Sequence, residues 1–491
     1  MIFSNRIHIN FNIIFRLSGM LLCIEALFMS IALIISIIYD ERDDIMGLMW
    51  SSLITFGTGL LMSFLTKNKN SDMGKREGFL LTGITWLLFS IFGTLPFILC
   101  PTGLNLASAF FESASGITTT GASVITDVEN CSHGILMWRA ISHFIGGMGI
   151  ILFTLAVLPM LNKQSGVQLF NAEVTGITHD KVRPRISHTA KCLWIVYIAL
   201  IVICAILLWI GPMNFFDAIC HSLSAISTGG FSTKNLSIEG FNSDYIKIIM
   251  TIFMFLSGIN FALLFNFAVG NRKALLKNDT FKWYTGITLL GFAIIFIGLI
   301  SFSNHTDILG LFIDTLFQTV SAITSSGFTG SNFTQWHGIT IITLLTIMFV
   351  GSCAGSTAGG AKIDRLMITL KNTKNEIYRI LHPNTIMPIR ANGKVISQDL
   401  VTKTGAFLLI FVCMIIVGTT ILIAQGFKEF DALFTTISCA SNNGLGYGAT
   451  ASNFSTIPDL SKYIMSLLMI IGRLEIFTII IIFTRTFWNK E

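Results

Sequence analysis

Residues 108–121, "SAFFESASGITTTG", have three further copies in the chain, and this repeat decides the fold. With Gly121 superposed on Gly230, Gly327 and Gly444, the other copies read "DAICHSLSAISTGG", "DTLFQTVSAITSSG" and "DALFTTISCASNNG". Each copy runs through about two turns of mostly apolar residues and ends in small polar residues before the glycine. An Asp or Ser ahead of an apolar run is typical of a helix N-cap. We therefore expect four short helices, capped by Ser108, Asp217, Asp314 and Asp431.

The composition around these repeats is that of a membrane protein. Of the 491 residues, 53% are hydrophobic and only 12% are charged, against about 25% charged in soluble domains. Apolar runs of about 20 residues, enough to cross about 30 Å of hydrocarbon, occur near 17–39, 46–66, 78–99, 138–159, 192–211, 245–267, 283–302, 339–361, 402–424 and 462–484. The first run is too long for a signal-peptide core and has no small-residue cleavage site after it, so we expect a retained helix.

Basic residues indicate the orientation of these spans. Of the 32 Lys and Arg, 25 lie in the N-terminal segment, in 66–78, 162–191, 270–282 and 362–403, and in the C-terminal segment. Cytoplasmic loops are enriched in these residues, so both termini are predicted to be cytoplasmic. The net charge of +6 then reflects orientation and does not indicate nucleic-acid binding.

Each short helix falls in a connection on the other side of the membrane. It is too short to span the bilayer, so the chain enters part-way and returns. Irregular backbone at that depth is tolerated only where it is buried in protein or lines a water-filled path. The predicted fold is therefore an all-α polytopic membrane protein with four pseudo-symmetric repeats of helix, pore helix and helix around one pore. The expected boundaries are 1–72 for two additional helices, then 73–165, 166–275, 276–385 and 386–491 for repeats 1 to 4.

The polar end of each repeat is suited to binding a cation. The partially negative C-terminal ends of four short helices would point toward the centre, and carbonyl and hydroxyl oxygens would replace a hydration shell. The alternative is a set of external turns rich in Ser, Thr and Gly, but four copies in register favour a selectivity filter. The candidate cation-binding residues are Thr118, Thr119, Thr120, Gly121, Ser227, Thr228, Gly229, Gly230, Thr324, Ser325, Ser326, Gly327, Ser441, Asn442, Asn443 and Gly444.

Ten small or polar residues, 351–360, interrupt the apolar run 339–361. A helix there would have poor propensity, so an intramembrane loop is predicted, with small-residue helix packing as the alternative. The stretch "GGAK" lacks the GK[ST] ending of a nucleotide-binding loop. The candidate residues of this intramembrane loop are Gly351, Ser352, Gly355, Ser356, Thr357, Gly359 and Gly360.

Charged residues inside the apolar runs are further candidates. Arg473, in the last run, must face water or a partner because a guanidinium in hydrocarbon is costly. Glu475 projects from a different helix face and is not expected to pair with it, and the partner of Glu25 in the first run cannot be named. Three residues before the aligned serine of each repeat stand Glu112, His221, Gln318 and Thr435, which are expected to brace the filter by hydrogen bonds rather than bind ions.

Four long motifs, "FFESASGITTTGAS", "SAISTGGFST", "GSCAGSTAGGAKIDR" and "GRLEIFTIIIIFTRTFW", give the chain a family resemblance. It resembles the TrkH branch of the Trk/Ktr/HKT potassium-transporter superfamily over nearly its whole length, including the two additional N-terminal helices. It departs from the family pattern at Ser325 and Ser326, where threonines are commoner, and at Ser352, where glycine is usual.

The resemblance implies K⁺ selectivity from four filter glycines, with Na⁺ permeation when serine replaces the first. It implies a gate loop beneath the filter and Arg473 as a positive barrier in the pore or a brace of that loop. It also implies a bacterial inner-membrane homodimer whose cytosolic regulatory subunits bind a nucleotide (ATP or NAD), with no cofactor in this chain. The segments 162–191 and 362–403 are either solvated basic loops or the docking face for that subunit.

Three functions remain to be compared. Gated, channel-like K⁺ uptake would be driven by the membrane potential, about 2.3 kcal/mol per charge per 100 mV. K⁺ symport with H⁺ or Na⁺ would need a second ion site or a titrating carboxylate, and Glu25 and Glu475 are the intramembrane acids. A membrane-embedded enzyme is the weakest alternative because the chain has neither HExxH nor GxSxG, so no enzymatic activity is predicted.

Overall fold

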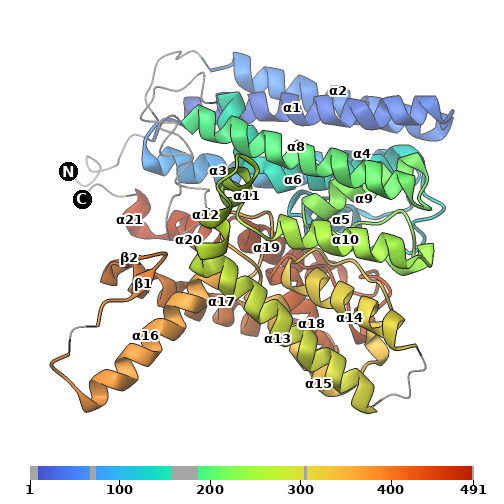
Figure 1. Cartoon of the computed structure of the whole chain (residues 1–491). Helices are drawn as coiled ribbons and strands as arrows, with labels where there is room; N and C mark the ends of the chain where they lie inside the picture. The colour runs from blue at the N-terminus through green and yellow to red at the C-terminus, as the bar shows by residue number, and fades with distance from the viewer. Residues whose placement is uncertain (1–8, 67–72, 158–185, 303–306, 386, 489–491) are drawn as a thin grey trace, which may run out of the picture.

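The computed structural model describes residues 9–66, 73–157, 186–302, 307–385 and 387–488. Two helices come first, α1 (Phe11–Ile38) and α2 (Arg42–Phe64), packed side by side as a hairpin along one edge (Figure 1). Four units of helix, short helix and helix follow. This arrangement is the predicted all-α polytopic fold, and the boundary between repeats 1 and 2 lies outside the described residues.

The four units have corresponding elements. Repeat 1 contains α3 (Lys75–Phe92), α4 (Leu95–Leu99), α5 (Leu106–Ile117) and α6 (His133–Val157). Repeat 2 contains α8 (Ile186–Ile210), α9 (Phe215–Ile226), α10 (Asp244–Ser257), α11 (Phe261–Ala268) and α12 (Arg272–Lys277). Repeat 3 contains α13 (Asp279–Phe302), α14 (Ile308–Ile323), α15 (Gly338–Val350) and α16 (Ile363–Leu381). An antiparallel ribbon of β1 (Arg390–Ala391) and β2 (Lys394–Val395) leads to repeat 4, with α17 (Gln398–Ala424), α18 (Glu429–Ala440), α19 (Asp459–Arg473), α20 (Ile476–Ile480) and α21 (Arg485–Trp488).

The short pore helices α5, α9, α14 and α18 begin elsewhere than predicted. Asn105 caps α5 by accepting the Ser108 N–H at 2.9 Å, and Asn214 caps α9 by accepting the Asp217 N–H at 2.7 Å. The caps of α14 and α18 are Asp307 and Lys428. The prediction of N-caps at Ser108, Asp217, Asp314 and Asp431 was therefore wrong, because each helix starts at least three residues earlier.

Six helices in the described ranges are long and apolar enough to cross a membrane, and two bent pairs raise the number to at most eight. The predicted continuous spans 245–267 and 462–484 were wrong. Helices α10 and α11 meet at 105°, and α19 meets the segment Ile476–Phe483 at 109°. Asn260 caps α11 at the first bend, and Glu475 has a φ of +59° at the second. Each break spans only a few residues within an apolar run, so hydropathy averaged over about 20 residues does not reveal it.

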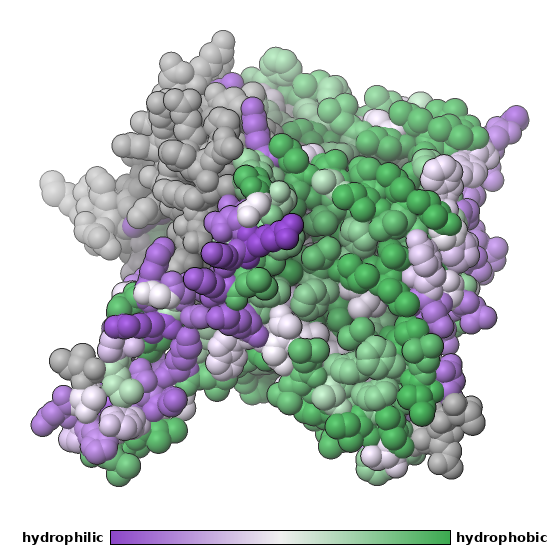
Figure 2. Space-filling view, viewed as in Figure 1, coloured by the Kyte–Doolittle hydropathy of each residue, from purple (hydrophilic) through white to green (hydrophobic). Residues whose placement is uncertain are grey.

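Exposed apolar side chains cover the outward sides of several spans, for example Leu27 on α1, Leu290 on α13 and Leu409 on α17. Figure 2 shows the resulting hydrophobic band between two more polar ends. Contiguous apolar surface of this extent is suited to lipid contact. The structure thus has the surface of a multi-pass membrane protein.

Both ends of the described chain lie at one end of the molecule, which we call the terminal face (Figure 1). The Asn10 N–H donates to Glu77 at 3.3 Å, and Arg76 donates to the Phe487 carbonyl at 2.8 Å. The ribbon β1–β2 and α16 also project there, and Asn392 in the ribbon turn accepts the N–H of Asp279 at 2.7 Å. We call the other end, where the pore helices begin, the opposite face.

Candidate functional site

The four pore helices end one residue before the four predicted filter segments. At the first filter position, the N–H groups of Thr118, Ser227, Thr324 and Ser441 donate to helix carbonyls four residues back, at 2.9 to 3.3 Å. The next two N–H groups in each segment also donate to the last carbonyls of their own helix. The backbone N–H groups of the first three positions in each filter segment are therefore satisfied by the helix ends.

The second residue of every filter segment has a left-handed backbone. The φ angles are +54° at Thr119, +58° at Thr228, +50° at Ser325 and +53° at Asn442. Such angles are uncommon for residues other than glycine. Their recurrence at one aligned position shows that the four segments share a single backbone conformation despite different side chains.

The four glycines join the segments into a closed ring. A Cβ added to Gly121 would collide with the Gly229 carbonyl oxygen, and one added to Gly230 would collide with the Ser326 oxygen. Gly327 faces the Asn443 oxygen in the same way, and Gly444 faces the Thr120 oxygen. The glycine φ angles lie between +69° and +91°. Each repeat thus packs on the next around one axis, and only glycine fits at the contact.

The carbonyl groups of the filter remain available. Among the described residues, hydrogen bonds reach none of the sixteen filter carbonyl oxygens except that of Ser227, which accepts from the Thr228 hydroxyl at 2.6 Å. Buried carbonyls normally have a hydrogen-bond partner. A ring of carbonyl oxygens that accept no hydrogen bond is suited to a cation and unsuited to an anion.

The hydroxyl side chains of the filter mostly serve its own packing. The first residue of each segment donates to the pore helix four residues back, as Thr118 does to the Ala114 carbonyl at 2.6 Å. In repeat 4 the amide of Asn442 donates to the Thr120 hydroxyl at 3.0 Å, and that of Asn443 donates to the Ala322 carbonyl at 2.8 Å. The asparagines thus tie repeat 4 to both neighbours, a contact that the sequence did not indicate.

A vestibule of about 440 Å³ leads to the filter from the opposite face. Gly121, Gly230, Gly327 and Gly444 all line it, together with the loops that follow each filter segment. The ring of glycines therefore lies at the base of an open cavity.

The predicted gate loop follows α15 at Val350 and lies against the filter on the side away from the vestibule. The Gly359 N–H donates to the Ser325 hydroxyl at 2.6 Å, and the Thr357 hydroxyl donates to the Ile226 carbonyl at 3.0 Å. A Cβ on Gly359 would collide with the Ser441 carbonyl oxygen. The loop thus contacts repeats 2, 3 and 4, and Thr357 is buried.

Other predicted loop residues shape the turn and its anchors. Gly351, Gly355 and Gly360 have φ angles of +71°, +79° and +80°, and the Ser352 and Ser356 hydroxyls lie 3.1 Å apart. Two anchors were missed from the sequence. Asn260, at the bend between α10 and α11, donates to the Ala354 carbonyl at 2.8 Å, and Asp364 accepts the Ala354 N–H at 2.7 Å.

Two cationic side chains hold the loop from the terminal face. Arg473 donates to the Thr357 carbonyl and, at 2.7 Å, to the Gly146 carbonyl of α6. Lys362, another residue that sequence reasoning missed, donates to the Ala358 carbonyl and is buried. Both line a cavity of only about 60 Å³ between the loop and α19.

The acids predicted near this region have different surroundings. Glu475 forms an ion pair with Arg365, so Arg473 is not its partner. Glu25 lies elsewhere, buried in α1, and neither of its carboxylate oxygens has a hydrogen-bond partner among the described residues.

The four aligned bracing positions behave unequally. Glu112 accepts the Val124 N–H at 2.8 Å, and Gln318 accepts the Gly330 N–H at 3.4 Å, so both bond to backbone just after the filter. His221 and Thr435 instead contact the hydroxyls of Ser232 and Thr450. All four positions are buried beside the filter.

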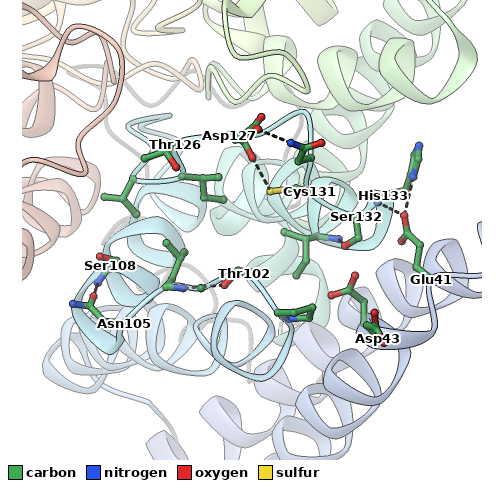
Figure 3. Close-up of a pocket in the computed structure, with 18 of the residues that line it drawn as sticks. Glu41, Asp43, Thr102, Asn105, Ser108, Thr126, Asp127, Cys131, Ser132 and His133 are labelled. Carbon is green, nitrogen blue, oxygen red and sulfur yellow. Dashed lines mark hydrogen bonds and ion pairs between the residues drawn. The ribbon is translucent and has the colours of Figure 1, made fainter.

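A separate pocket of about 1090 Å³ opens at the opposite face between the α1–α2 connection and repeat 1, and it contains no filter residue (Figure 3). On its wall Glu41 accepts hydrogen bonds from the backbone N–H groups of His133 and Gly134, at 2.6 and 3.1 Å, where α6 begins. Burial alone raises the pKa of Glu41, but the hydrogen bonds from His133 and Gly134 outweigh it, so the pKa lies below its usual value.

The fold and site define a class: a multi-pass membrane protein with four covalently joined re-entrant units around one axis. Comparison with known proteins identifies the family. The profile of the TrkH family, described as a cation transport protein, matches residues 45–490. The chain is 34% identical to "Trk system potassium uptake protein TrkH" of Escherichia coli strain K12, over 98% of this chain and 100% of that protein.

Two further relatives support the same family assignment. "Trk system potassium uptake protein TrkG" of Escherichia coli K12 is 33% identical over 97% of this chain and 99% of its own length. The crystal structure of the potassium transporter TrkH from Vibrio parahaemolyticus superposes with a TM-score of 0.89 at 33% identity, over 98% of this chain and 100% of that chain. The chain therefore belongs to the TrkH family, a family of transport proteins and not of enzymes.

Proposed function

We propose that this chain carries out potassium uptake through the ring formed by its four filter segments. The observation that carries the proposal is the ring itself: backbone carbonyls without donors surround one axis, and each glycine packs on the neighbouring repeat. Oxygen ligands of this kind replace the water around a desolvated cation. The relatives named as potassium uptake proteins support K⁺ as that cation.

The pore has a gate in this proposal, formed by residues 351–362. The loop lies against the filter segments of repeats 3 and 4 and against the end of α9 in repeat 2, and Arg473 and Lys362 donate hydrogen bonds to its carbonyls. The cavity of about 60 Å³ beside it has room for no more than a few water molecules. In the proposed mechanism this loop position is the closed state, and ion passage requires the loop to leave the axis.

The mechanism we propose is channel-like permeation driven by the membrane potential, about 2.3 kcal/mol per charge per 100 mV. K⁺ symport coupled to H⁺ or Na⁺ is the second candidate, and Glu25 is the observation in its favour because a buried, unpartnered carboxyl could carry a proton. Glu25 lies in α1, outside the four repeats, and Glu475 is already paired, which favours the channel.

Orientation and partners complete the proposal. We place the chain in the bacterial inner membrane with the terminal face in the cytoplasm, in agreement with its basic segments. A homodimer and a cytosolic nucleotide-binding regulatory subunit are proposed partners, and α16 with the ribbon β1–β2 is the described part of the docking face. Most of the other candidate segment, 162–191, lies outside the described residues.

The test is the zero-current voltage of the purified protein in liposomes under a K⁺ gradient, with and without pH and Na⁺ gradients. A voltage at the K⁺ equilibrium value, unchanged by the other gradients, is the expected result. A voltage that moves with pH or Na⁺ only while K⁺ is present would favour symport. A voltage indifferent to K⁺ would refute the function.

A further inference from the structure

We propose that the buried ion pair of Glu112 and Arg139 is a selectivity-determining brace that fixes the first two filter segments relative to each other. Arg139 is a positioning residue, since it acts through filter backbone and does not touch the ion. This inference rests on the proposed function, because it assigns residues that set the selectivity of that pore.

Glu112, on α5, hydrogen-bonds to the residues that directly follow filter segment 1. Its Oε2 accepts the Val124 N–H at 2.8 Å, and its Oε1 accepts the Ser123 hydroxyl at 2.9 Å. These two residues follow Gly121 by two and three positions. The carboxylate is fully buried, so its charge must be balanced locally.

Arg139, on α6, balances this charge and extends the contact to repeat 2. Its Nε donates to Glu112 at 2.9 Å, one terminal nitrogen donates to the Ser123 hydroxyl at 3.1 Å, and the other donates to the Ser232 carbonyl at 3.0 Å. The guanidinium also lies 4.1 Å from the ring centroid of Phe231. Ser232 follows Gly230 by two positions, as Ser123 follows Gly121. The Arg139 guanidinium therefore connects equivalent positions just after the first two filter segments.

The chemistry of arginine is essential to this brace. A guanidinium presents donors in a fixed planar fork and stacks on an aromatic ring, whereas lysine offers one compact charge on a flexible stem. At the positions aligned with Glu112, the other repeats carry His221, Gln318 and Thr435, none of which forms an ion pair in the described residues. Among the described residues, an ion pair at this aligned position therefore occurs in repeat 1 alone, where it joins repeat 1 to repeat 2.

The position of Arg139 gives the pair a second effect. Arg139 lines the vestibule beside Gly121 and Gly230, where an uncompensated positive charge would repel cations. Loss of Glu112 should therefore lower both selectivity and K⁺ flux. Arg139→Lys keeps the positive charge that balances Glu112 but loses the planar guanidinium. It should therefore lower the K⁺/Na⁺ selectivity with a smaller change in K⁺ flux.

The chain offers a matched control pair. Lys247 and Asp314 form an ion pair at 2.5 Å that also joins neighbouring repeats, 2 and 3, and no described hydrogen bond links either side chain to the backbone after a filter glycine. Arg139→Lys is compared with Lys247→Arg, and Glu112→Gln with Asp314→Asn. The readout is the K⁺/Na⁺ permeability ratio from zero-current voltages in liposomes, with monodispersity and the K⁺-dependent rise in Tm as checks on folding and binding.

We expect Arg139→Lys to lower the ratio at least about tenfold, the effect of losing one charge-assisted hydrogen bond, while Lys247→Arg retains it. A folded Arg139→Lys protein with the wild-type ratio, or an equal loss in Lys247→Arg, would overturn the inference. If Arg139→Lys does not fold, Ser123→Ala removes only the hydroxyl shared by the pair, and an unchanged ratio there overturns the inference as well. A wild-type protein without K⁺ selectivity would instead refute the proposed function itself.

Discussion

Replacement of Gly121 by Ser tests the glycine ring most directly. The new Cβ meets the Gly229 carbonyl oxygen, with the backbone of Gly230 directly behind it. Both neighbours are backbone atoms of the adjacent filter segment, so they cannot move aside as a flexible side chain would. The substitution must therefore displace either filter segment 1 or filter segment 2 from its position in the ring.

The cost follows from two separate effects. A left-handed φ of +82° costs a residue with a Cβ about 1–2 kcal/mol, and overpacking a rigid contact costs about 1–3 kcal/mol more. The total is about 2–5 kcal/mol of folding stability. A displacement that changes the relative affinity of the ring for K⁺ and Na⁺ by about 1.4 kcal/mol lowers the K⁺/Na⁺ permeability ratio about tenfold.

Gly103 provides the control because its backbone is also left-handed but an added Cβ there meets no neighbouring atom. Its φ is +70°, and no atom lies within 4 Å of an added Cβ. Gly103→Ser should therefore lose only about 1–2 kcal/mol and keep its selectivity. Thermal unfolding and zero-current voltages under opposed K⁺ and Na⁺ gradients measure both quantities. Equal destabilisation of the two variants, or an unchanged permeability ratio in Gly121→Ser, would refute the inference that packing at Gly121 sets the geometry of the glycine ring.

Three further variants test the gate and the fold. Arg473→Gln should raise K⁺ flux into liposomes, because the loop loses charge-assisted hydrogen bonds of about 1.5–3 kcal/mol each; flux at the wild-type rate would argue against a closed gate. Asp364→Asn should speed amide hydrogen exchange in residues 351–362 and leave the K⁺/Na⁺ ratio intact; unaltered exchange would show that this anchor contributes little. Glu41→Gln should destabilise the protein by about 1 kcal/mol at neutral pH. Since the pKa of Glu41 is lowered by folding, the wild-type advantage in Tm is full above the unfolded pKa of about 4.3 and disappears as pH falls through the lowered value; an advantage that grows on acidification would contradict this assignment.

Much of the site could be predicted from the sequence because it is repeated. Four aligned glycines identify one backbone requirement, and the structure places all of them at the same contact. The helix caps were predicted wrongly because Asn and Asp are both good N-caps, and Asn105 and Asn214 precede the predicted residues by one turn. The role of Asn260 and the pairing of Glu112 with Arg139 had no signal in the sequence, since each depends on a partner 94 or 27 residues away along the chain.

The sequence by itself determined the all-α membrane fold, the fourfold repeat and the positions of the four polar segments that we propose as the filter. These properties follow from hydropathy, helix length and local backbone preference, which neighbouring residues carry. The tertiary structure alone decided the sharp bends at Gly258–Asn260 and Leu474–Glu475, the order in which each glycine packs on the next repeat, and the contact of loop 351–362 with repeats 2, 3 and 4. Those features depend on which backbone carbonyls and buried charges meet across the pore, and distant segments meet only when the four repeats close around one axis.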